Sequence, residues 1–118
     1  SPLEAIGGPE ALRSTLTDFY AACRADPLLS PTFARVSDWE AHLSRAQRFW
    51  ETLLGEGGAQ PWRGHLGRIH APLGISGAQV ERWLTLFERS AHRCLSPQGA
   101  ALLSTRARAM RQRLGART

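Results

Sequence analysis

The sequence predicts an all-α protein. Its apolar side chains recur every three or four residues, as they do on the buried face of a helix, and no segment alternates with the two-residue period of a β-strand. Capping residues and prolines stand where these periodic segments begin and end. Because 118 residues with 42% hydrophobic content can bury a core, we expect residues 1–118 to form a single domain.

The first long helix is expected to begin at Gly8-Pro9, because proline is favoured at the first helical position. Asp26-Pro27 should end it, since the residue before a proline avoids the helical region, and Ser30-Pro31 marks a further turn. Between these points one apolar stripe is predicted to face the core, made of Leu12, Leu16, Phe19, Tyr20 and Cys23.

A second helix is expected after Ser37-Asp38-Trp39-Glu40, which fits the Ser-x-x-Glu pattern of a capping box with Ser37 as the cap. The glycine-rich segment 55–61 then predicts a loop, because glycine and proline cannot continue a helix cheaply. One side of this second helix is expected to present Trp39, His42, Ala46, Phe49, Trp50 and Leu53.

Two more helices follow a segment, 62–75, that we expect to be partly helical at most. Ser76-Gly77-Ala78-Gln79 is another capping box, and Ser96-Pro97 ends that helix and caps the last one. The apolar side of the third helix is predicted to carry Val80, Trp83, Leu84, Phe87, Ala91 and Cys94, and that of the last helix Leu103, Ala107, Met110 and Leu114.

The net charge of +5 raises the possibility of a small basic helical protein that binds nucleic acid. We keep this as a remote alternative and expect no nucleic-acid partner, because the arginines are dispersed along the chain. Their one cluster, Arg106, Arg108, Arg111 and Arg113, is interpreted as the solvated face of the last helix. No apolar run is long enough to cross a membrane and no signal peptide is evident, so we expect a cytoplasmic protein without membrane contact.

Two histidines lie in apolar company, which is unusual for an unpaired polar ring. His42 shares a helix face with Trp39 and Phe49, and His70 stands between Ile69 and the segment 71–73. Aromatic side chains at helical spacing usually fill a core, and a buried histidine is often satisfied by a backbone carbonyl. However, two imidazoles on separate apolar segments can also reach opposite sides of one flat hydrophobic ligand, and neutral imidazole is a common metal ligand.

Several segments in order make the chain resemble a truncated haemoglobin from about Gly7 to the final helix. They are Phe19-Tyr20, the run RADPLLSPTF at 24–33, DWEAH at 38–42 with Phe49-Trp50, and RWLTLF at 82–87. Phe33, Trp39, His42 and the Phe49-Trp50 pair resemble the third group of that family, which we favour. The stretches 63–65 and 68–73 resemble the second group.

The resemblance implies a globin-like, two-over-two helical sandwich around haem, with His70 as the proximal ligand to iron. It places Tyr20, His42 and Trp83 as hydrogen-bond donors on the opposite, distal side, and Phe33 against the porphyrin. Arg45 is expected to reach a haem propionate, and Arg63 and Arg68 are weaker candidates for that task. The remaining pocket residues that we predict are Ala46, Phe49, Trp50, Leu73 and Phe87.

The expected function is reversible binding of dioxygen by non-covalent haem b, since no CxxCH motif offers a covalent attachment. Three distal donors predict slow release of the gas. Nitric oxide, carbon monoxide, cyanide and peroxide are further expected ligands. The alternative is a haem redox enzyme, a nitric-oxide dioxygenase or a peroxidase-like protein, which would need a separate reductase because the chain encodes no flavin or nicotinamide domain.

Overall fold

The computed structural model describes residues 1–55 and 70–111, and within them the chain forms helices and no strands. The long helices are α2 (Gly8–Ala25), α4 (Trp39–Leu53), α6 (Gly77–Cys94) and α7 (Pro97–Ala109). Short helical turns fill much of the remainder: α1 (Pro2–Ala5), α3 (Ser30–Phe33) and the 3₁₀ helix η1 (Ala71–Leu73). The all-α prediction is therefore confirmed.

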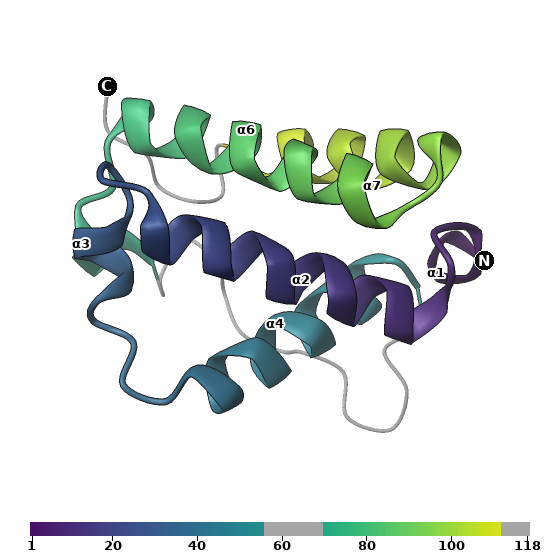
Figure 1. Cartoon of the computed structure of the whole chain (residues 1–118), viewed down its shortest axis with the longest axis horizontal. Coiled ribbons are helices and arrows are strands. Elements are labelled where there is room, and N and C mark those ends of the chain that lie inside the picture. The colour runs from purple at the N-terminus through teal and green to yellow at the C-terminus, as the bar shows by residue number, and fades with distance from the viewer. Residues whose placement is uncertain (56–69, 112–118) are drawn as a thin grey trace.

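The helices pack as two pairs, α2 with α4 and α6 with α7. Figure 1 shows α2 crossing the middle of the molecule, with α4 on one side of it and α6 on the other, while α7 lies behind α6. Leu12, Leu16, Phe19 and Cys23 of the predicted stripe on α2 are completely buried, and Tyr20 is partly exposed. None of the helices in the described part of the chain has both the length and the apolar character to cross a membrane.

The capping boxes predicted from the sequence have different outcomes. At Ser76 the prediction is confirmed: the Gln79 N–H donates to Ser76 Oγ at 3.1 Å, and the Ser76 N–H donates to Gln79 Oε1 at 2.9 Å. At Ser37 it is wrong, because Asp38 is the cap and accepts a hydrogen bond from the Ala41 N–H at 3.1 Å. An aspartate caps as well as a serine, so the helix begins one residue later than Ser37 would place it.

Two short helices were not predicted. Ser1 caps α1 by accepting a hydrogen bond from the Glu4 N–H at 3.3 Å. Ser30-Pro31, predicted as a turn, instead begins α3, because a proline is tolerated in the first turn of a helix. Just before α3, the Asp26 carboxylate accepts hydrogen bonds from the Leu28 and Leu29 N–H groups at 3.1 and 3.2 Å and folds the chain back.

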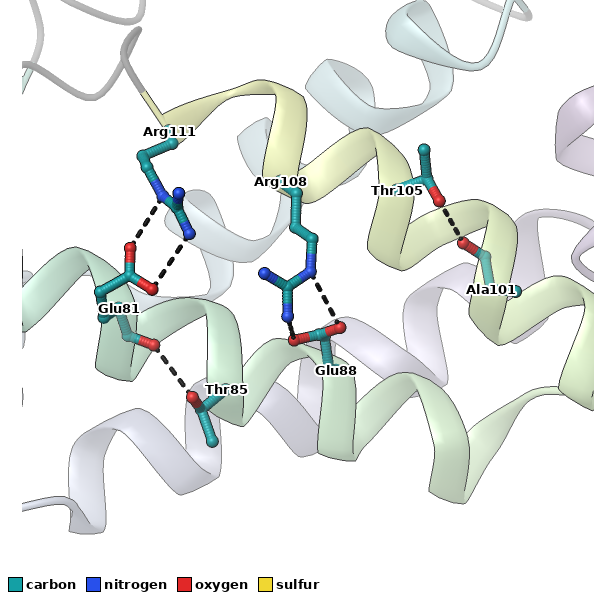
Figure 2. Close-up of polar contacts among 7 residues, drawn as sticks. All are labelled: Glu81, Thr85, Glu88, Ala101, Thr105, Arg108 and Arg111. Atoms are coloured by element: carbon teal, nitrogen blue, oxygen red, sulfur yellow. Dashed lines mark hydrogen bonds and ion pairs between the residues drawn. The ribbon is translucent and has the colours of Figure 1, made fainter.

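The arginine cluster on the last helix does more than face solvent. Figure 2 shows Arg108 and Arg111 of α7 reaching across to Glu88 and Glu81 of α6, each through two nitrogens. Arg106 donates to the Leu53 carbonyl at 3.1 Å, at the end of α4. Arg108 and Arg111 are exposed, as the solvated-face interpretation predicted, and all three side chains also tie α7 to its neighbours. Arg113 and Leu114 lie outside the described residues.

Candidate functional site

A cavity of about 580 Å³ lies between the two helix pairs, within the range of roughly 300–1,000 Å³ that is usual for cofactor and small-molecule pockets. All the predicted pocket residues except Phe87 line it. They are Tyr20, Phe33, His42, Arg45, Ala46, Phe49, Trp50, His70, Leu73 and Trp83. Residues from α2, α3, α4, α6 and the segment that precedes α6 thus converge on one mostly apolar space.

The two histidines that the sequence singled out both line this cavity, from different segments. His42 projects from α4, and His70 directly precedes η1. Burial lowers the pKa of His42, and the charges of Arg45 and His70 lower it further. The lowered pKa keeps the His42 ring neutral at pH 7.

One buried polar atom in the cavity lacks a protein partner. His42 Nε2 is shielded from solvent and makes no hydrogen bond within the described residues, although the ring contacts Tyr20 and Trp39 edge-on, with centroids 4.9 and 5.3 Å apart. An unsatisfied buried nitrogen of this kind costs free energy. A polar ligand in the cavity would remove that cost, so the observation indicates a binding site.

Tyr20 brings a hydroxyl donor to the same side of the cavity. Burial raises the pKa of this hydroxyl far above its ordinary value, and the nearby Cys23 adds to the shift. The phenol therefore keeps its proton at any physiological pH. Its ring lies edge-on to Phe33 at 5.9 Å and tilted against Trp39 at 5.8 Å, so aromatic neighbours from α3 and α4 hold its position.

Phe87 lies one layer behind the cavity wall. It is completely buried and stacks on Trp50 at 5.0 Å and on Trp83 at 5.4 Å, and both tryptophans line the cavity. Phe87 therefore supports the two rings that form the wall without lining the cavity itself, and its predicted contact with the cofactor stays a prediction. A spacing of four residues from Trp83 placed Phe87 on the same helix face, but spacing does not tell how far a side chain on that face lies from the cavity.

Sequence reasoning also missed part of the lining. Arg35 is an exposed cation at the cavity edge, as Arg45 is, and it lies in the short connection between α3 and α4 where no helix pattern points to a site. Arg63 and Arg68, the weaker candidates, lie outside the described residues. The other lining residues that were not predicted are Leu29, Thr32, Val36, Ser37, Asp38, Ala41, Ile75, Gln79, Val80 and Met110.

The donor set fits a porphyrin iron. A mostly apolar cavity that two histidines from different segments line can hold a haem whose iron takes one histidine as an axial ligand. The unpartnered His42 Nε2 and the Tyr20 hydroxyl lie where a polar ligand would be satisfied, and Arg35 and Arg45 lie at the edge, where carboxylates would be. The fold and the site together therefore define a truncated, haem-binding globin.

Comparison with known proteins leads to the family. The family model described as bacterial-like globin matches residues 1–112, and the chain belongs to this family. No curated protein matches the sequence at a significant level.

Solved structures are similar in fold. The group II truncated haemoglobin of Bacillus anthracis has a TM-score of 0.85 at 23% identity, over 100% of this chain and 92% of that one. The haemoglobin of Chloroflexus aurantiacus has a TM-score of 0.82 at 21% identity, over 97% and 96%. The group II 2-on-2 haemoglobin of Agrobacterium tumefaciens has a TM-score of 0.73 at 21% identity, over 93% and 92%. The two-over-two fold is confirmed, and membership of the third group stays a prediction.

Proposed function

We propose that the cavity holds haem b non-covalently, with His70 as the axial ligand to iron, and that the protein binds dioxygen reversibly and releases it slowly. The observation that carries this proposal is the pairing of the two histidines in one apolar cavity, with His42 Nε2 left unsatisfied. Non-covalent binding follows from the chain's two cysteines: neither Cys23 nor Cys94 lines the cavity.

The haem would supply the iron position at which a diatomic gas binds, and the residues of this chain would control that gas. Tyr20 keeps its hydroxyl proton and can donate it to a ligand that carries partial negative charge. The neutral His42 ring and the Trp83 indole are the other two donors that we assign to the distal side. Arg45 and Arg35, exposed at the edge, would pair with the propionates.

Absorption spectra of the ferric, ferrous and carbonmonoxy forms test this proposal, recorded on the wild type and on His70→Ala. We expect a Soret band for the wild type and a lost or altered proximal signature in His70→Ala. His92→Ala is the matched control, because His92 is exposed on α6 and does not line the cavity. The absence of a Soret band after haem addition would end the globin proposal, and an unchanged signature in His70→Ala would end the ligand assignment.

Catalysed nitric-oxide dioxygenation or peroxidase-like turnover is the second function that we keep. It shares the same cavity and donors but needs electrons from a separate reductase. Consumption of nitric oxide measured with and without added reductase separates the two: stoichiometric reaction in both cases supports the binding protein, and sustained turnover with the reductase supports the enzyme.

A further inference from the structure

The side-chain amide of Gln79 joins two walls of the cavity. Its Oε1 accepts a hydrogen bond from the Ser76 N–H at 2.9 Å, at the end of the segment that carries His70. Its Nε2 donates to the Leu28 carbonyl and to Thr32 Oγ1, both at 3.3 Å, on the α3 side. Gln79 itself lines the cavity and is half-buried. One amide therefore connects the proximal segment with α3.

The α3 end of this connection leads to the distal donor. Thr32 precedes Phe33, and the Phe33 ring lies 5.9 Å from the Tyr20 ring and 6.0 Å from the Trp39 ring. A shift of α3 would move Phe33 and so loosen the aromatic contact that orients Tyr20. Since α3 is a single turn of four residues, its own backbone hydrogen bonds give it little rigidity.

A second polar link holds a different part of this region. Arg82 Nε donates to Asp26 Oδ1 at 2.7 Å, and the same carboxylate accepts from the Leu28 and Leu29 N–H groups. Burial alone would raise the pKa of Asp26, but Arg82 and these amides hold it below its usual range. This link fixes the turn before α3, whereas Gln79 reaches into α3 itself. Loss of Gln79 would leave α3 held by this turn and by the Phe33 ring contacts, without the side-chain hydrogen bond to Thr32.

We propose that Gln79 is a positioning residue that fixes α3 against the proximal segment and thereby sets the orientation of Tyr20 toward the bound gas. This inference rests on the proposed function, because it assumes that Tyr20 serves a ligand in the cavity. It predicts that the hydrogen bond from Tyr20 to the bound gas depends on the Gln79 side chain, although Gln79 belongs to α6, which begins next to the segment that carries His70.

Two substitutions at position 79 separate its three hydrogen bonds. Gln79→Glu keeps the acceptor for the Ser76 N–H and can accept from the Thr32 hydroxyl, but it removes the donor to the Leu28 carbonyl. Gln79→Met removes all three. Gln47→Met is the matched control: Gln47 is also half-buried and links two elements, with Nε2 donating to the Pro9 carbonyl at 3.0 Å, but it does not line the cavity.

Two measurements on the haem-loaded protein decide the matter. Hydrogen exchange follows the Phe33 and Ala34 amides, which donate to the Leu29 and Ser30 carbonyls at 3.2 and 2.8 Å. The C–O stretching band of the carbonmonoxy form follows the distal donors. We expect Gln79→Met to speed this exchange about fivefold, the ratio that corresponds to one ordinary hydrogen bond, and to shift or broaden the band. Gln79→Glu, which can keep the contact with Thr32, should change both less. Gln47→Met should change neither.

The proposal is overturned if Gln79→Met leaves exchange and band unchanged, or if Gln47→Met produces the same changes. It is also overturned if exchange rises without any change in the band, since Gln79 would then hold α3 but not Tyr20. A protein that takes up no haem would refute the proposed function instead, and amide exchange alone would then show whether Gln79 holds α3.

Discussion

The two helix pairs satisfy their polar groups in different ways. Between α6 and α7, the Arg108 and Arg111 side chains each form a two-nitrogen ion pair with a glutamate, and the apolar side chains of α7 that face the core are completely buried (Figure 2). On the other pair, α4 supplies much of the lining of the cavity, and His42 Nε2 of α4 has no partner within the described residues.

This difference separates the α6–α7 interface, where side chains bond to one another, from the cavity, where a ligand can be accommodated. On the α6–α7 side, Ser104 Oγ of α7 is also buried without a partner within the described residues, but it does not line the cavity, so a ligand there cannot satisfy it. A side that leaves a buried nitrogen and a protonated phenol facing an apolar cavity is stabilised when a ligand accepts or shares those hydrogen bonds. Substitutions on the two sides should therefore separate folding from binding.

The largest effect is expected from Leu103→Ala on α7. Leu103 is completely buried, so the substitution should lower the free energy of unfolding by roughly 2–5 kcal/mol, while the folded fraction keeps its gas affinity. Chemical denaturation followed by far-ultraviolet circular dichroism measures the change. Leu28→Ala is the control, since Leu28 is 44% exposed and should cost far less. Equal losses in both variants would contradict this assignment of the core.

Tyr20→Phe should change gas binding and leave stability almost unchanged, the reverse of Leu103→Ala. Loss of a hydrogen bond to a partly charged ligand should speed dioxygen release between about 10- and 100-fold, while the free energy of unfolding changes little. Stopped-flow displacement of dioxygen measures the rate. Thr85→Val removes a hydroxyl from α6, away from the cavity, and should leave the rate unchanged. A fast release that Tyr20→Phe does not alter would refute the slow-release proposal.

A smaller, pH-dependent effect is expected from His42. Because its pKa in the folded protein lies below the ordinary value of 6.5, the unfolded chain binds a proton first as pH falls. The stability contributed by the neutral ring is therefore complete above pH 6.5 and is lost as pH falls from there toward the folded-state pKa. Denaturation midpoints at several pH values between 7.5 and 5 should fall less in His42→Leu than in the wild type, and identical slopes would contradict the shift.

The smallest effect is expected from the ion pairs of α7. All four side chains of the Arg108–Glu88 and Arg111–Glu81 pairs retain solvent contact, with Arg108 53% and Arg111 46% exposed. Arg108→Ala or Arg111→Ala should each cost about 0.2–1 kcal/mol, and less at high salt. Thermal unfolding at low and high ionic strength measures this, and a larger loss that salt does not reduce would mean that the side chains act through packing.

Much of the fold could be predicted because the local signals agree with the tertiary structure. At Ser76 the capping box, the glycine after it and the apolar spacing all indicate the same helix start, and the structure confirms it. At Ser37 two capping residues stand side by side, and spacing alone does not tell which one has the extended backbone of a cap. The helices α1 and α3 were missed because a single turn leaves no periodic pattern.

The site, like the fold, could be predicted in part. Helical spacing identified faces, so His42, Ala46, Phe49 and Trp50 were correctly placed on the cavity side of α4. Spacing does not measure distance from the cavity, which is why Phe87 was assigned to it. Residues such as Gln79 and Arg35 line the cavity because of how the segments pack in three dimensions. Their local sequence gives no pattern from which a position at the cavity could be predicted.

The two cysteines differ in burial, and this affects how readily each thiol can be oxidised. Cys23 is completely buried one turn from Tyr20, and burial together with the charge of Asp26 raises the pKa of its thiol. Because the thiolate is the form that oxidants and nitrosating species attack, Cys23 is protected chemically as well as sterically. Cys94 is partly exposed and donates to the Ser14 carbonyl at 3.9 Å, and burial and the charge of Asp18 raise the pKa of its thiol as well. Both thiols are therefore held in the less reactive protonated form, and Cys94, which does not line the cavity, is the more accessible of the two.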